Sequence, residues 1–112
     1  MYSQREQISM KSKLESIEAQ LNYIKVQLLE IDYILRTENK KNDQLIEEQL
    51  QKISLTNTLC EKENITKYYI PFHEAFCELI VLKQAEKQKL VEEQKKLTNE
   101  LIVIKNALSA DN

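Results

Sequence analysis

The side chains of this sequence that could take part in catalysis or metal binding are few and scattered. There is one histidine, His73, with two cysteines, Cys60 and Cys77, and adjacent acidic pairs at positions 47–48 and 92–93. Neighbouring helix positions point about 100° apart, so neither acidic pair can form a shared acid–base site. The cysteines lack metal-ligand spacing, and no nucleophile with an orienting acid accompanies the histidine.

These observations predict that the chain is not an enzyme and that it holds no metal and no cofactor. We expect His73 to be a partly buried or capping imidazole, because it lies close to the apolar phase of a helix. We expect Cys60 and Cys77 to be small apolar fillers near a loop.

The composition excludes several other classes of function. The 112 residues include no glycine, one proline and no tryptophan, and 16 basic residues stand against 18 acidic ones. Without glycine there is no Gly-rich phosphate loop, and long helices are favoured over tight β-hairpins. No basic block suits nucleic acid, no apolar run could span a bilayer, and residues 1–7 lack a signal-peptide core. We therefore expect a cytoplasmic protein that neither binds nucleic acid nor inserts into a membrane.

Apolar residues recur at alternating spacings of four and three in two tracts. The first tract is Met10, Leu14, Ile17, Leu21, Ile24, Leu28, Ile31 and Leu35, and the second is Leu90, Leu97, Leu101, Ile104 and Leu108, with Gln94 at its one polar position. This is the spacing of a coiled-coil seam. It predicts an all-α fold in which two long helices form an antiparallel coiled-coil hairpin, a single domain over 1–112. A monomeric hairpin is favoured over a homodimer.

Two apolar gaps of eleven residues suggest where the chain reverses. One separates Leu35 from Ile46, where the pattern resumes with Leu50 and Ile53, and the other separates Leu79 from Leu90. Each gap predicts a four-residue stutter, which unwinds a supercoil locally. If the two gaps lie opposite each other in an antiparallel pair, the residue numbers of any two facing residues add up to about 125. The chain then reverses near residue 62.

This register predicts the bounds of the helices. We expect a first helix over about 4–60, a loop over about 61–69 with Asn64 as a left-handed cap, and a second helix over about 70–109. Pro71 then lies in a first turn, where proline is tolerated. A start at Thr66 with a kink at Pro71 is the alternative. The register sets Leu21 beside Ile104 and Leu28 beside Leu97.

Two groups of apolar residues fall outside the seam and are candidate partner-binding residues. The first group is Tyr23, Val26, Leu29, Tyr33, Ile102 and Val103, in the terminal half of the hairpin. The second group, near the loop, contains Tyr68, Tyr69, Phe72 and Phe76. Contiguous exposed apolar surface usually marks a partner, and aromatic residues dominate interface hot spots. The alternatives are a third helix or a homodimer seam for the first group, and a plug that closes the hairpin for the second.

A glycine-poor, cytoplasmic, antiparallel helical hairpin with free termini resembles the FliJ/YscO stalk proteins of type III secretion systems, in the style of the SpaM/InvI branch of virulence systems. The resemblance is architectural and covers nearly the whole chain. It implies a stalk that binds and stimulates the hexameric export ATPase through its paired termini. It further implies that the loop end faces an export gate protein, that secretion chaperones are escorted, and that the protein lies at the inner-membrane secretion apparatus.

Two other functions are compatible with the same pattern. One is a generic coiled-coil scaffold that self-associates. The other is a prefoldin-like chaperone subunit, in which a β-hairpin separates the two helices and residues 65–70 supply one strand.

Overall fold

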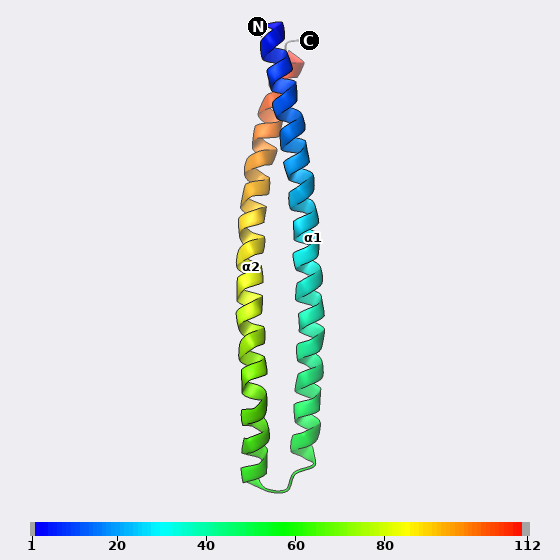
Figure 1. The fold of residues 1–112 in the computed structure, drawn as a ribbon, viewed down its shortest axis with the longest axis vertical. Coiled ribbons are helices and arrows are strands. Elements are labelled where there is room, and N and C mark those ends of the chain that lie inside the picture. Colours follow the sequence, from blue (N-terminus) through cyan, green and yellow to red (C-terminus); the bar gives the residue numbers. More distant parts are fainter. Residues whose placement is uncertain (1, 111–112) are drawn as a thin grey trace. The chain divides into compact units, whose positions relative to one another are not determined.

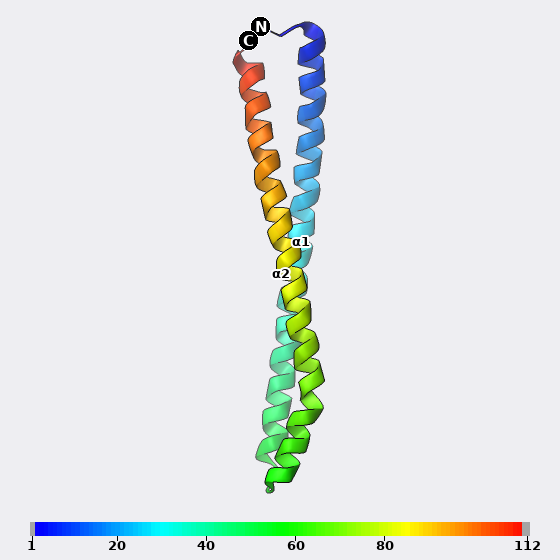
Figure 2. The ribbon, with the colours of Figure 1, turned by 90° about the vertical axis from the view of Figure 1, so that its left-hand side faces the viewer.

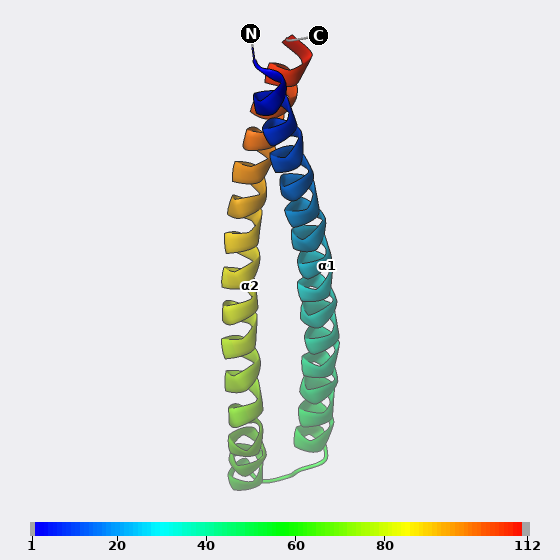
Figure 3. The ribbon, with the colours of Figure 1, turned by 45° about the horizontal axis from the view of Figure 1, so that its top comes forward.

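The computed structural model describes residues 2–110, and these residues form two helices. Helix α1 spans Gln4–Ser54 and helix α2 spans Leu59–Ala110. They pack against each other in an antiparallel hairpin (Figure 1), and residues 55–58 make the connection, the thin green trace in Figure 3. The predicted fold class is confirmed.

The chain divides into two compact units, each with a stretch of both helices. The terminal unit contains residues up to Glu30 and from Glu86 onward, and the loop unit contains Ile31–Ala85. Within each unit the two stretches run side by side in opposite directions (Figures 1 and 2).

The core of the terminal unit is the seam that the heptad spacing predicts. Its buried centre is Ile17, Ile24, Leu97 and Ile104, and packed against it are Met10, Leu14, Leu21, Leu28, Leu90, Leu101 and Leu108. The predicted partners Leu21 and Ile104, and likewise Leu28 and Leu97, thus share one apolar cluster. The pairing of individual residues within it stays a prediction.

The loop unit does not contain the predicted stutters. Half-buried positions of α1 continue after Leu35 at spacings of three and four, through Glu38, Asn42, Leu45 and Gln49. The apolar residues expected to replace them, Ile46 and Leu50, are 39% and 60% exposed. On α2 the inward positions likewise continue through Tyr69, His73, Phe76, Ile80 and Lys83. The heptad repeat therefore continues without a slip through the loop unit, and polar side chains occupy several of its inward positions.

The predicted position of the turn is wrong. The loop is residues 55–58 instead of about 61–69, α1 ends at Ser54, and α2 begins at Leu59 instead of about residue 70. No described residue has a positive φ angle, so Asn64 is not a left-handed cap. The register of about 125 also fails here, because it would set His73 opposite position 52, whereas His73 contacts Asn42 and Gln49.

Side-chain oxygens satisfy backbone groups on both sides of the short loop. The Thr58 hydroxyl accepts a hydrogen bond from the Glu61 amide at 3.2 Å, which makes Thr58 the N-cap of α2. At the end of α1, the hydroxyls of Ser54 and Thr56 donate to the carbonyls of Gln51 and Ile53 at 2.7 and 2.9 Å. Four residues without glycine can therefore reverse the chain.

Pro71 lies inside α2, a dozen residues after the helix begins. Both expectations for the start of this helix, near residue 70 and at Thr66, are wrong. The segment 65–69, predicted to be irregular, is helical. Proline supplies no amide hydrogen, so one bond of the helical ladder is missing at this point.

Neither helix contains a described stretch apolar enough, over sufficient length, to cross a membrane.

Candidate interaction surfaces

In the terminal unit, the predicted partner residues lie outside the core. Tyr23, Val26 and Leu29 on α1 and Ile102 and Val103 on α2 are all exposed, Val26 to 51% and Leu29 to 62%. They are exposed because each lies between seam positions of its helix and the other helix covers only the seam. Tyr33, in the loop unit, is exposed as well. Their role in binding stays a prediction.

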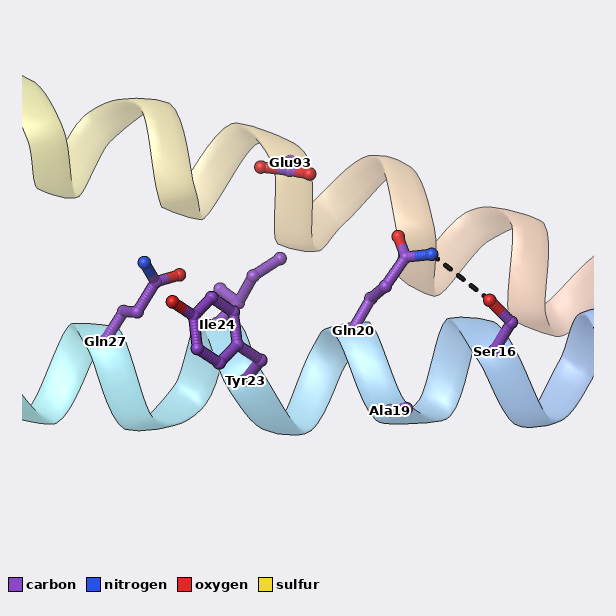
Figure 4. A pocket seen from close by; sticks show the side chains of 7 residues that line it. All are labelled: Ser16, Ala19, Gln20, Tyr23, Ile24, Gln27 and Glu93. Atoms are coloured by element: carbon purple, nitrogen blue, oxygen red, sulfur yellow. Dashed lines mark hydrogen bonds between the residues drawn. The ribbon is translucent and has the colours of Figure 1, made fainter.

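A shallow groove runs beside the seam of the terminal unit (Figure 4). Its lining residues on α1 include Gln20, Tyr23, Ile24 and Gln27, and α2 contributes Glu93. In the figure, Ile24 points toward α2, while the Tyr23 ring lies along the outside of α1. Although several lining residues are polar, most of the surface that the groove exposes belongs to apolar atoms, so it adds apolar surface beside the exposed Tyr23.

Three aromatic rings gather near the loop, at the start of α2. Tyr68 and Tyr69 meet edge to face with ring centroids 5.2 Å apart, and Phe72 lies 5.6 Å from Tyr68 and 6.4 Å from Tyr69. The structure brings these predicted residues together, but it does not expose them equally. Tyr69 is 1% exposed and Phe76 is half-buried on the seam, whereas Tyr68 and Phe72 are exposed. Of these four predicted residues, Tyr68 and Phe72 are the two that offer large surfaces to a partner.

Lys52 of α1 covers the two tyrosines. Its ammonium nitrogen lies 5.3 Å from the Tyr69 ring centroid and 5.8 Å from that of Tyr68, and 3.3 Å from the Glu48 carboxylate. The Tyr69 phenol, followed by Glu48, raises the pKa of the Lys52 ammonium above its ordinary value. The buried Tyr69 hydroxyl has no hydrogen-bond partner among the described residues, and the contact that Lys52 makes with Tyr69 is a cation–π contact with its ring. The tyrosines therefore serve in part to close the hairpin.

His73 forms a polar layer between the helices of the loop unit. Its Nδ1 is 3.1 Å from the Asn42 Oδ1, and its Nε2 is 3.0 Å from the Gln49 Oε1. The two amides are one heptad apart on α1, so the ring spans the gap between two seam positions. The expectation of a partly buried histidine is confirmed. A neutral imidazole has one N–H, so which of the two amides receives a hydrogen bond depends on the tautomer of the ring.

The remaining candidates for chemistry stay apart. Cys60 and Cys77 are free thiols and both are exposed, so the expectation that they fill apolar gaps near the loop is wrong. Within residues 2–110, no group of three or more His, Cys, Asp and Glu side chains is placed to hold a metal ion.

Sequence reasoning missed one apolar surface, on α2 of the loop unit. Val81 and Leu82 are 65% and 63% exposed, and neither was among the predicted partner-binding residues. The signal was present in the spacing of Tyr68, Phe72, Ala75, Leu79 and Leu82, which alternates between four and three. It was missed because Leu79 was assigned to the inner seam, as the start of the gap that ends at Leu90.

Comparison of the chain with protein-family models, curated proteins and solved structures finds no match.

Proposed function

We propose that this protein is a coiled-coil stalk of a type III secretion apparatus, which binds and stimulates the export ATPase and links it to the export gate. The support is twofold. The two-helix hairpin is the architecture that the resemblance to FliJ/YscO proteins requires. The described residues also bear apolar side chains that their own core does not cover.

The observation that carries the proposal is the exposure of Val26 and Leu29 on α1, and of Ile102 and Val103 on α2, in the terminal unit. Apolar side chains stabilise a protein when they are buried. In a hairpin that acts alone, these exposed side chains would therefore add no stability. In the proposed stalk, they contact the inner surface of the hexameric ATPase. Tyr68 and Phe72 of the loop unit face the gate, and a role in escorting secretion chaperones would use the same exposed surfaces.

The test is binding to a candidate secretion ATPase, with nucleotide turnover measured in parallel. Val26→Glu with Leu29→Glu leaves the core cluster untouched, so helicity by circular dichroism should be retained. Co-elution with the ATPase and stimulation of hydrolysis should both fall at least tenfold. Asn39→Glu with Gln44→Glu adds the same charge at exposed positions of the loop unit and is the matched control. Stimulation that survives the first double substitution would contradict the proposal.

A self-associating scaffold is the second candidate, and the same exposed side chains favour it. The two functions differ in the mass of the purified protein. A stalk gives the 13.2 kDa monomer by light scattering, whereas a scaffold gives a stable oligomer that dissociates on Val26→Glu and Leu29→Glu.

The prefoldin-like alternative is wrong. It requires a β-hairpin between the helices, but only residues 55–58 connect them, and the segment 65–70 lies in α2.

A further inference from the structure

The loop unit leaves large apolar side chains of both helices outside its seam. On α1, Ile46 and Leu50 are 39% and 60% exposed, and on α2, Tyr68 and Phe72 are 62% and 44% exposed. Each of them is the neighbour of an inward residue of its own helix. The two on α1 come one position after that residue, and the two on α2 come one position before it. The offset is therefore regular on each helix and opposite in direction.

The observed register sets these side chains at matching heights along the hairpin. His73 lies between Asn42 and Gln49, so the numbers of facing residues in this unit add up to about 118. One step forward on α1 and one step back on α2 leave this sum unchanged. The two helices can therefore exchange one set of facing residues for the other by turning in place, without sliding along each other.

The residues that this exchange would bring together are all apolar. We call them the level pairs, and they are Ile46 with Phe72, Leu50 with Tyr68, and Ile53 with Ile65. Their spacing of four and three on each helix is that of a coiled-coil seam. The observed seam instead has the amides of Asn42 and Gln49 on α1, with His73 between them. Burial of apolar area favours the level pairs over this polar layer.

Other contacts favour the observed packing. Tyr69 is 1% exposed, and the Lys52 ammonium lies 5.3 Å from the centroid of its ring. His73 lies within hydrogen-bond distance of two amides. These contacts would be lost if the helices turned. Each packing thus satisfies a different part of the same sequence, which is the condition for a bistable element.

The local backbone permits a turn of this kind. A shift by one residue position rotates a helix by about 100° about its axis. Pro71 lies beside Phe72 and donates no hydrogen bond to the preceding turn of α2, so the helix is easiest to twist there. The connection of residues 55–58 is the nearby segment outside the helices that can absorb the rotation.

We propose that the loop unit has a second packing, in which each helix is turned by one residue position and the level pairs face each other. The observed packing exposes Tyr68 and Phe72, which the proposed function assigns to the gate, and the second packing covers them. A partner that binds these two side chains would hold the unit in the observed packing. Only this consequence rests on the proposed function, because the second packing itself depends on the loop unit alone.

Disulfide trapping in the full-length protein tests the second packing. In a background with Cys60→Ser and Cys77→Ser, Ile46→Cys with Phe72→Cys should form a bond within one chain under oxidised glutathione. In the observed packing these two positions lie apart. Phe72 shares a groove with Lys41, and Lys41 is about 140° from Ile46 around α1. Bond formation therefore requires the helices to turn.

A mirror-image pair of cysteines is the matched control. Gln44 and Glu74 are exposed, and their numbers add up to the same sum, but each is offset from the seam in the opposite direction. We expect the pair at positions 46 and 72 to close about tenfold faster than Gln44→Cys with Glu74→Cys. Equal rates would show general looseness of the loop unit and would overturn the proposal, as would a bond that forms only between chains.

Three further substitutions, each added to the pair at positions 46 and 72, test the cause. Leu50 belongs to a level pair and Val81 does not, yet the two are almost equally exposed. Leu50→Asn should slow closure about tenfold, and Val81→Asn should leave the rate within about twofold. His73→Ala weakens the observed packing and should speed closure. A rate that ignores Leu50→Asn, or that falls in His73→Ala, would overturn the proposal. The assay contains no ATPase or gate protein, so its outcome is independent of the proposed function.

Discussion

Tyr69 combines the deepest burial among the described residues with a phenol oxygen that lacks a hydrogen-bond partner. Burial of its ring stabilises the loop unit, whereas burial of an unsatisfied hydroxyl costs about 1–3 kcal/mol. The Lys52 ammonium, 5.3 Å from the ring centroid, offsets part of this cost through its interaction with the π face. The residue is therefore structural first, and an interpretation of it as a direct partner contact does not fit its burial.

We predict that Tyr69→Phe keeps or raises the melting temperature, because it removes only the unsatisfied hydroxyl. Tyr69→Ala should lower the unfolding free energy by about 3–5 kcal/mol, as for other buried aromatic residues. Tyr68→Ala, beside it but exposed, should cost only about 1 kcal/mol through the lost edge-to-face contact. Urea unfolding followed by circular dichroism measures all three. Equal losses for Tyr68→Ala and Tyr69→Ala would contradict this assignment.

At the scale of the helices, the sequence predicted the core correctly where apolar residues keep the heptad spacing without interruption. Ile17, Ile24, Leu97 and Ile104 were identifiable as seam residues because nothing polar competes with them. The turn was misplaced because the step from Leu35 to Ile46 was interpreted as a slip of the seam, although the amides of Asn42 and Gln49 occupy the seam there opposite His73. A better signal for the turn was available in Thr58-x-x-Glu61, since this spacing starts helices.

The sequence predicted Pro71 in the first turn of the second helix, but it lies in the interior of α2. An interior proline costs about 3 kcal/mol relative to alanine, because a backbone hydrogen bond is lost and the ring clashes with the preceding turn. Pro71 is exposed, so little packing is lost on its removal.

We predict that Pro71→Ala raises the unfolding free energy by about 1–3 kcal/mol. Pro71→Gly also restores the amide hydrogen, but its gain should be about 1 kcal/mol smaller because glycine disfavours helices. Thermal and urea unfolding of both variants measure the difference. A loss of stability in Pro71→Ala would show that the proline ring has a packing role that its exposure does not suggest.

On the scale of the whole chain, the two units differ in the chemistry of their seams. The terminal unit has a continuous apolar cluster, whereas the loop unit places Glu38, Asn42, Gln49 and His73 at inward positions and leaves Ile46 and Leu50 exposed. The sequence indicated the exposed surfaces of the terminal unit well, because the core there follows the heptads. On α2 of the loop unit the apolar spacing that ends at Leu82 was visible, but assigning it to the exposed face required knowing which of two competing phases faces α1.

This difference predicts unequal local stability. Each apolar side chain removed from a seam forfeits about 1.5–3 kcal/mol of burial, and a hydrogen-bonded polar pair returns about 1 kcal/mol. Amide hydrogen exchange should therefore be about tenfold or more faster over 36–50 and 70–84 than over 14–28 and 92–104, because local opening in the loop unit costs less free energy. Asn42→Leu with Gln49→Leu and His73→Leu should slow exchange in the loop unit selectively and leave the terminal unit unchanged. Uniform protection across both units, or slower exchange in both units of the triple variant, would contradict the idea that the polar seam residues lower the stability of the loop unit.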